Sequence, residues 1–135
     1  MAIEQSMTTQ AKQTALAYLT EGVIKMALYT AEANLGPSTL VYTTSNEVVG
    51  TGYTAGGKVM TGVTVTVSGT TAFVDFNDVE WDPASFTARA ALIYNSSIGD
   101  TAIAVLDFGS DKTATATFRV QMPANTATSA IIRIA

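Results

Sequence analysis

The sequence contains no cysteine and no histidine. Without these side chains, Ser–His and Cys–His nucleophile pairs cannot be assembled, and a metal finds neither thiolate nor imidazole ligands. Disulfides are excluded for the same reason. The chain therefore cannot use the common forms of nucleophilic catalysis, and its carboxylates are the main candidates for catalysis or metal binding.

Charged residues are also scarce, at 13% of the chain against about 25% in an average globular protein. The seven lysines and arginines stand singly and the net charge is −4, whereas phosphate recognition needs clustered cations. We therefore expect no nucleic acid as a partner. Interface cores are depleted of charge, so the composition favours a protein that works within an assembly.

Long apolar runs are missing as well. No stretch approaches the roughly 20 apolar residues that span a bilayer, and the first ten residues, MAIEQSMTTQ, lack the basic start and apolar centre of a signal peptide. We expect no membrane as a partner, and a chain that stays in the cytoplasm where it is made unless it leaves inside a larger particle.

What the sequence does contain is alternation of apolar and polar residues. Its 135 residues suit one domain. A helix is predicted over residues 6–20, with Ser6 or Thr8 as its cap. We expect residues 1–22 to form an N-terminal arm and helix, and residues 23–135 to form a β domain.

About eight short strands are predicted in that domain, over residues 23–30, 40–44, 59–67, 71–76, 86–95, 101–108, 113–122 and 130–135. Short strands at a spacing of roughly 8–12 residues are typical of a sandwich or barrel. The predicted fold is a mainly β, single-domain antiparallel β-sandwich, jelly-roll-like, with a short N-terminal helix. An immunoglobulin-like sandwich would give the same pattern.

Two features of these strands predict the core. Residues 102–106 are apolar on both faces, so the strand over residues 101–108 is expected to be central and the most buried. The other expected core positions are every second residue of three strands, namely Ile24, Met26, Leu28, Val63, Val65, Val67, Ala114, Ala116, Phe118 and Val120.

The densest charge cluster is an acidic corner formed by Asp75, Asp78, Glu80 and Asp82. Such carboxylates can bind Ca²⁺ or act as an acid–base pair. Their spacing, however, matches no Ca²⁺ loop, and the tight glycine turn of such loops is missing. We interpret the corner as a charged strand edge that resists aggregation, or as a rim facing a partner. No metal, cofactor or catalytic residue is predicted.

A glycine-rich stretch over residues 46–58 invites comparison with a phosphate-binding loop. That motif requires Ser or Thr after Gly-Lys and then a helix, whereas here Lys58 is followed by Val59 and a predicted strand. We interpret the stretch as a mobile loop that can serve as a contact arm. Its candidate contact residues are Gly52, Tyr53 and Gly56.

Three further residues are candidates for partner contact. Ser6 and Lys12 lie in the arm and helix, which can dock on the chain's own sandwich or on a neighbour. Trp81 lies at a predicted turn, and together with Tyr53 it is the better candidate among the aromatic residues for contact with a carbohydrate.

Several segments of the chain are distinctive: KMALYT (25–30), YTTSNEVVGTGYTAGGK (42–58), TARAALIYNSS (87–97), AVLDFGSDKT (104–113) and AIIRIA (130–135). Together they resemble a group of small β-rich virion structural proteins of tailed bacteriophages, over residues 25–135. Relatives in that group begin with a helix containing Phe-Lys-Gln, where this chain has Ala11-Lys12-Gln13. The resemblance implies a virion component, assembled in the host bacterial cytoplasm, and brings no catalytic residues.

Our first hypothesis is a non-enzymatic capsid decoration (cement) protein that bridges neighbouring capsid subunits. Its partners would be the major capsid protein or other virion proteins. A homo-oligomer is expected, with a trimer favoured because shells offer three-fold positions. The alternative is a tail, neck or fibre-associated module, either structural or recognising a host carbohydrate.

Overall fold

The computed structural model describes residues 2–135. These residues form one helix and nine strands, which are α1 (Thr9–Leu19), β1 (Ile24–Tyr29), β2 (Lys58–Val59), β3 (Thr64–Ser68), β4 (Thr71–Asp75), β5 (Val79–Trp81), β6 (Phe86–Asn95), β7 (Thr101–Ala114), β8 (Phe118–Val120) and β9 (Ile132–Ile134). The predicted class, a mainly β domain with antiparallel sheets and a short helix, is confirmed. The jelly-roll arrangement is not confirmed.

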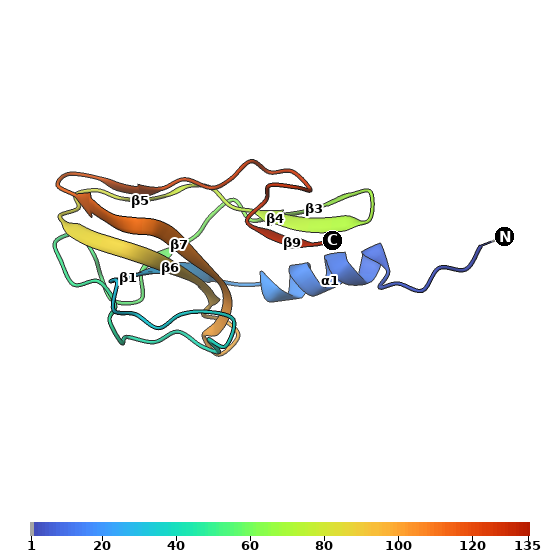
Figure 1. The fold of residues 1–135 in the computed structure, drawn as a ribbon, viewed down its shortest axis with the longest axis horizontal. Helices are drawn as coiled ribbons and strands as arrows, with labels where there is room; N and C mark the ends of the chain where they lie inside the picture. The colour runs from blue at the N-terminus through green and yellow to red at the C-terminus, as the bar shows by residue number, and fades with distance from the viewer. Residues whose placement is uncertain (1) are drawn as a thin grey trace.

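The strands form three antiparallel sheets, with orders β2-β1-β6-β7, β3-β4-β9 and β5-β8. The four-stranded sheet lies at one end of the elongated molecule, with the β5–β8 pair across from it (Figure 1). At the other end, α1 lies against β4 and β3. The large sheet and α1 therefore form one layer of the molecule, and the two smaller sheets form the other (Figure 1).

The main core lies between these layers. Ile24, Met26 and Leu28 are at most 1% exposed, which confirms the predicted inward face of β1. The rings of Phe86 and Phe118 bring β6 and β8 together, with centroids 5.1 Å apart. Burying a large apolar side chain stabilises the fold by roughly 1.5–3 kcal/mol, so this cluster of rings joins the two layers firmly.

A second cluster covers the other face of the large sheet. Ala27, Tyr29, Leu92 and Tyr94 are buried there beneath the loop over residues 31–47. Tyr42 of that loop stacks on Tyr94 with ring centroids 4.8 Å apart. Because β1 and β6 are covered on both faces, almost all their residues are apolar.

The position predicted for β7 is wrong. β7 lies at the edge of the large sheet and β6 is central, between β1 and β7. Ala104 and Leu106 pack on the main core, but Val105, on the other face, is 36% exposed. The loop over residues 31–47 covers β1 and β6 but leaves β7 exposed on that face. The apolar pattern of β7 alone could not predict this difference.

The hairpin β3–β4 is confirmed, with Ser68 paired to Thr71 across the turn. Its expected core pattern is only partly right, since Val65 packs on the core while Val63 and Val67 are exposed. β3 is the outer strand of its sheet and lacks a full covering layer. The strand predicted over residues 40–44 is reduced to a single bridge between Val41 and Thr101.

The helix is shorter than predicted. Thr8, rather than Ser6, is its cap, because the Thr8 hydroxyl oxygen accepts a hydrogen bond from the Ala11 amide at 3.2 Å. Leu16 is 1% exposed and fixes the helix on the domain. At the other end, the Asn95 side-chain amide donates to the carbonyls of Leu19 and Glu21. The helix is therefore held at both its middle and its end.

Candidate functional site

The glycine-rich loop is fastened to the large sheet through Glu47, which is only 8% exposed. One carboxylate oxygen accepts the Tyr42 hydroxyl at 2.6 Å. The other accepts the Gly56 amide at 2.8 Å and the Tyr53 hydroxyl. The Tyr53 hydroxyl in turn accepts a hydrogen bond from the Leu28 amide of β1. These bonds contradict the prediction of a mobile loop, and Tyr53 is an internal anchor rather than a partner contact.

Two glycines of this loop touch the body so closely that no side chain would fit. At Gly57, φ is +80° and a Cβ would lie 1.8 Å from the Met26 carbonyl oxygen. At Gly52, φ is +88° and a Cβ would lie 1.9 Å from the Pro83 carbonyl oxygen. Both glycines therefore have a left-handed backbone conformation, which glycine adopts readily, and both lie in close contact with a backbone carbonyl group. Gly52 is exposed and Gly56 is half-buried, so the loop leaves part of its backbone at the surface.

Burial sets the electrostatics of this network. It raises the pKa of Tyr29 and of Tyr94 to about 12. Burial, followed by the hydrogen bond to Glu47, also raises the pKa of Tyr42 and Tyr53. All four tyrosines are thus neutral at physiological pH and can donate hydrogen bonds. Because the Glu47 oxygens already accept three donors, the network fits a structural fastening better than a general base.

Trp81 was predicted at an exposed turn, and that prediction is wrong. The residue lies in β5, is 1% exposed and is packed beside Tyr53 and Phe118, each with ring centroids 6.2 Å away. β5 pairs with β8, and alternation along β5 turns Val79 and Trp81 inward. Its ring is therefore not available to a carbohydrate.

The four carboxylates of the acidic corner do not gather into one site in the structure. Asp78 accepts hydrogen bonds from the Met122 amide at 2.7 Å and the Arg119 guanidinium at 2.8 Å, and these bonds, the amide first, hold its pKa below the ordinary carboxyl value. Glu80 and Asp82 are exposed. Within residues 2–135, no three carboxylates are placed to share a metal ion. The corner is best described as a charged strand edge.

The two N-terminal candidates have different environments. Lys12 is 8% exposed, and its ammonium donates to the Thr70 carbonyl oxygen at 2.7 Å. It holds α1 to the β3–β4 turn, so it is not free to contact a partner. Ser6 lies in a segment of the chain, residues 2–7, whose residues are all exposed. We call this segment the arm.

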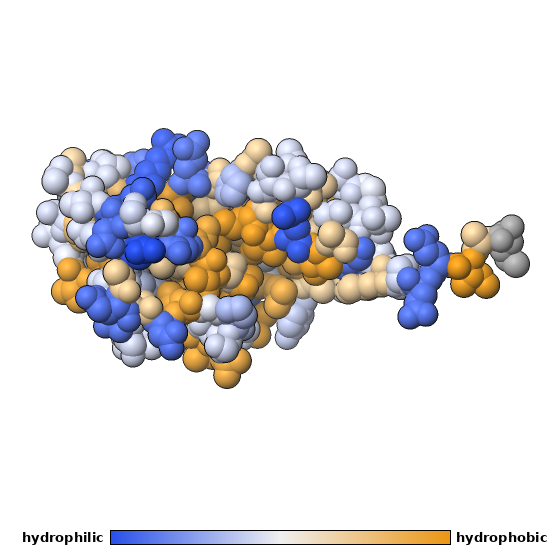
Figure 2. Space-filling model, viewed as in Figure 1, coloured by the Kyte–Doolittle hydropathy of each residue, from blue (hydrophilic) through white to orange (hydrophobic). Residues whose placement is uncertain are grey.

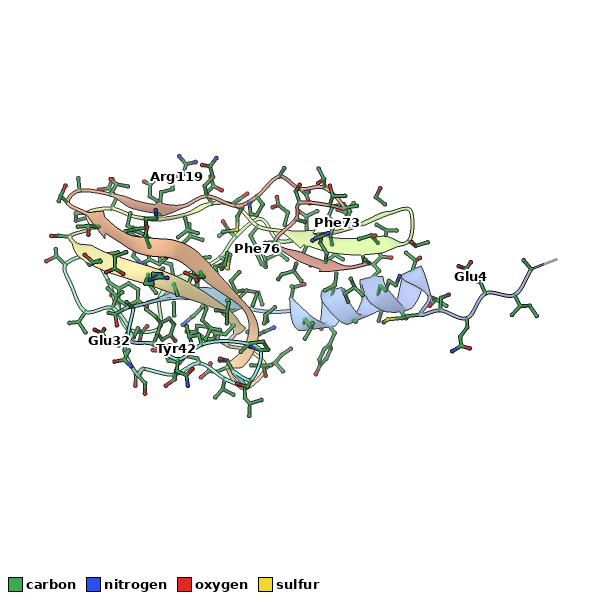
Figure 3. All side chains as sticks on the ribbon, viewed as in Figure 1. Glu4, Glu32, Tyr42, Phe73, Phe76 and Arg119 are labelled. Atoms are coloured by element: carbon green, nitrogen blue, oxygen red, sulfur yellow. The ribbon has the colours of Figure 1, made fainter. Side chains whose placement is uncertain are left out.

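The arm extends beyond α1, away from the rest of the molecule (Figures 1 and 2). Figure 3 shows Glu4 in the middle of the arm, far from the other labelled residues. Ile3 is 94% exposed. Of the six candidate contact residues, Ser6 in the arm and the exposed backbone at Gly52 remain accessible, and the structure does not bring these two together.

Sequence reasoning missed a second accessible surface, the outer edge of β7. The beginning of this edge is covered, because the Ala102 amide donates to the Leu40 carbonyl at 2.9 Å. Over residues 103–107 no described strand pairs with the outer side of β7. We call these residues the β7 edge.

A groove follows the β7 edge. One cavity of about 460 Å³ is lined by Gly36, Pro37, Thr39 and residues 102–105. A second, of about 200 Å³, is lined in part by Leu35, Val105 and Asp107. Val105 belongs to both linings, so the two cavities are neighbours. We call the first of them, beside residues 102–105, the edge groove. No sequence signal could reveal it, since its walls lie some 65 positions apart along the chain.

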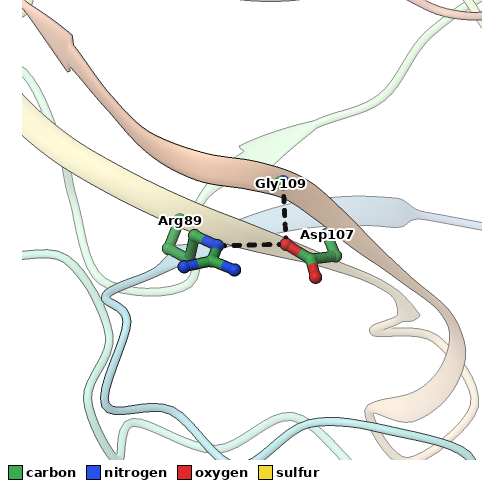
Figure 4. Close-up of polar contacts among 3 residues, drawn as sticks. All are labelled: Arg89, Asp107 and Gly109. Atoms are coloured by element: carbon green, nitrogen blue, oxygen red, sulfur yellow. Dashed lines mark hydrogen bonds and ion pairs between the residues drawn. The ribbon is translucent and has the colours of Figure 1, made fainter.

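The far end of the β7 edge is fixed by a polar contact. Asp107 accepts hydrogen bonds on one oxygen from Arg89 of β6, at 3.1 Å, and from the Gly109 amide, at 2.9 Å (Figure 4). The pairing of β6 and β7 is interrupted between Ala88 and Ala90. The Gly109 amide, followed by Arg89, lowers the pKa of Asp107, so at neutral pH this end of the edge carries a paired carboxylate.

Comparisons of the chain with protein-family models, with curated proteins and with solved structures gave no match. In the part of the chain that the structure describes, no helix has both the length and the apolar character needed to cross a membrane. The site is thus defined by its own geometry, as an exposed arm and an open strand edge.

Proposed function

We propose that this chain is a non-enzymatic structural protein of a tailed-bacteriophage particle, and that it acts as a capsid decoration protein which cements the head. The observation that carries the proposal is the combination of an exposed arm and an open apolar strand edge. Each provides contact surface, and they lie at different ends of the molecule.

The mechanism would be mechanical. A domain laid across neighbouring capsid subunits resists their separation in proportion to the surface that it buries, and a stable interface buries about 1,200–2,000 Å² in total. The fastened loop supports this role because it keeps the domain rigid, so that strain is transmitted rather than absorbed. The major capsid protein is the proposed partner, and a trimer on a three-fold position is the favoured arrangement.

The low charge and the sequence resemblance support the same proposal. Interfaces are depleted of Lys, Glu and Asp, and only 13% of this chain is charged. The segments that resemble virion proteins include residues 104–113, which contain most of the β7 edge. The proposal that the chain belongs to a phage particle therefore depends on that resemblance, whereas the proposed contact surfaces depend on the structure.

The host-recognition alternative depends on Tyr53 or Trp81 as the residue that contacts a carbohydrate. Trp81 is buried, and the half-buried Tyr53 uses its hydroxyl for Glu47 and Leu28. We therefore do not propose carbohydrate binding. A structural role in the neck or tail is the competing outcome of the test.

The test is the copy number of this chain in purified particles, with heads and tails separated and the chain quantified against the major capsid protein. Hundreds of copies confined to heads are expected. A dozen or fewer copies that fractionate with tails would overturn the cement role and place the chain in a neck or tail ring.

A further inference from the structure

We infer that the arm of one copy pairs, as an added strand, with the β7 edge of a second copy, so that the chains assemble head to tail. The inference deepens the proposed function and rests on it in one respect, namely that assembly is the role of this chain. It adds the surface and the partner, which is another copy of the same chain.

The β7 edge has little of the usual protection of an exposed strand. Natural proteins discourage strand addition with charged residues (especially lysine), proline or β-bulges at the edge, or with a very short edge strand. Residues 103–107 read Ile-Ala-Val-Leu-Asp and contain neither lysine nor proline, in a strand of 14 residues. Their one charge, on Asp107, is paired with Arg89, and the register shifts between β6 and β7 lie towards the two ends of this segment. At the opposite edge of the same sheet, β2 has only two residues. β7 is therefore the edge of this sheet that can accept another strand.

The edge groove offers a place for the side chains of the added strand. Its lining is largely apolar, with Pro37, Ile103 and Val105, and Val105 is 36% exposed. In an extended arm, successive side chains point to opposite faces, so that Ile3, Gln5 and Met7 share a face. Ile3 and Met7 are exposed in the isolated chain, at 94% and 50%. Two apolar side chains, with Gln5 between them, thus meet a largely apolar groove.

The lengths agree. An extended arm of six residues spans about 20 Å, and the five residues of the β7 edge span about 17 Å. The arm contains neither glycine nor proline, so no amide is lost to strand pairing, and every second amide can donate a hydrogen bond to the edge.

The arm cannot reach the edge of its own chain. It leaves from the beginning of α1, and α1 ends next to β1 of the large sheet. An arm folding back would first have to run along the 11 residues of α1, or about 16 Å, which uses most of its reach. Lys12 and Asn95 hold the helix in place, so the helix cannot swing to shorten this path.

Such a contact is heterologous, because two different surfaces meet. Heterologous contacts close into rings when the rotation between copies allows, and otherwise continue into filaments. A trimeric ring would have three equivalent arm–edge junctions.

The experiment measures molar mass by sedimentation equilibrium, from micromolar to millimolar concentration, for the full chain and three variants. One variant lacks residues 2–7 and keeps Thr8 as the helix cap. The second is Val105→Lys, which places a charge in the edge groove. The third, Val67→Lys, is the matched control, since Val67 is 37% exposed on the outer strand of a different sheet.

We expect the full chain and Val67→Lys to self-associate, and the other two variants to be monomers. An equimolar mixture of these two monomers should form a 1:1 dimer, since one still has its edge and the other still has its arm. Ile3→Ser, which alters only an exposed side chain, should raise the dissociation constant by roughly ten- to a hundredfold. It provides a test that does not depend on the folding of Val105→Lys.

Three results would overturn the inference. They are a full chain that is monomeric at every concentration, a Val105→Lys variant that folds and associates like the full chain, and a mixture in which the two monomers do not combine. The last result would point to symmetric pairing of two β7 edges. A monomeric full chain would leave the head count untouched, so failure of the arm–edge contact is distinguishable from failure of the proposed function.

Discussion

The loop over residues 46–58 lies against the four-stranded sheet, and β7 forms one edge of the same sheet. The loop is fixed by many contacts, whereas β7 is open along one side. The loop has little regular structure, yet its buried polar groups bond to the sheet, and its glycines lie against the backbone of β1 and of residue 83. β7 is the longest strand, yet over residues 103–107 no described strand pairs with its outer side. Secondary structure and fixation are thus separate properties, and the open surface of this molecule belongs to its longest strand.

Two carboxylates illustrate the physical difference. Glu47 is 8% exposed and accepts three hydrogen bonds, whereas the side chain of Asp107 is 68% exposed and accepts two on one oxygen. Hydrogen bonds are stronger in a low-dielectric interior, and exposed ion pairs contribute little. The loop should therefore respond strongly to substitution, and β7 weakly.

The largest effect is expected from Gly57→Ala. The new Cβ would overlap the Met26 carbonyl oxygen, at 1.8 Å, and φ at this position is +80°. The loop would have to leave β1, which we expect to lower the free energy of unfolding by at least about 4 kcal/mol. Urea unfolding followed by circular dichroism measures this change.

Gly69→Ala is the matched control. Gly69 has φ of +61° but open space around its Cβ position, so only backbone strain of about 1 kcal/mol is expected. Equal losses in the two variants would show that close contact of the loop with the body is unimportant.

The next largest effect is expected from Glu47→Ala. This change leaves the Tyr42 and Tyr53 hydroxyls and the Gly56 amide without their acceptor, at a cost of about 3 kcal/mol. Glu32→Ala is the control, because Glu32 is exposed and its carboxylate accepts a hydrogen bond only from the Thr30 hydroxyl. Similar urea midpoints for the two variants would contradict the fastening of the loop by Glu47.

Alkaline pH should weaken the same region. Tyr29 and Tyr94 have a pKa near 12 in the folded chain and about 10 when unfolded. Above pH 10 the unfolded chain releases protons that the folded chain retains. The contribution of these tyrosines to stability is therefore constant below about pH 10 and falls towards pH 12, by up to about 1.4 kcal/mol per pH unit for each. Tyr94→Phe should make the fall in urea midpoint shallower, and a midpoint that is flat over this range would contradict the burial of these hydroxyls.

The smallest effect is expected from Asp107→Asn, in the exposed contact with Arg89 and Gly109. Because the Gly109 amide and Arg89 lower the pKa of Asp107, its small contribution is present above the ordinary carboxyl pKa and is lost as the pH falls through the lowered value. We expect the urea midpoint at neutral pH to change by no more than its measurement error. A loss as large as that of Glu47→Ala would remove the contrast between the two regions.

Local patterns predicted the local elements well. The hairpin β3–β4 follows from alternation on both sides of Gly69, and the inward face of β1 follows from Ile24, Met26 and Leu28. The order of the strands was not predictable in this way, because β6 and β7 are both apolar and the choice of the central strand depends on which segment the loop over residues 31–47 covers. That choice is made by contacts between distant parts of the chain.

For the candidate site, as for the fold, the sequence predicted local features but not contacts between distant residues. The arm was predictable, because the residues before a helix cap have little to hold them in place. The burial of Lys12 and Trp81 could not be foreseen, since each depends on a partner far away in sequence, Thr70 for the lysine and Phe118 for the indole. The edge groove likewise exists only because residues 36–39 lie beside residues 102–105.

The position of β4 has a consequence for how the chain is made. β4 pairs with β3 on one side and with β9 on the other, and α1 packs against it. On the ribosome, α1 and the β3–β4 hairpin emerge well before residues 132–134, so one edge of β4 stays unpaired until β9 has been synthesised. Exposed strand edges make nascent chains prone to aggregation. The small sheet is thus closed by a strand that is made long after its two neighbours, and the speed with which β9 docks should govern how much newly made protein stays in solution.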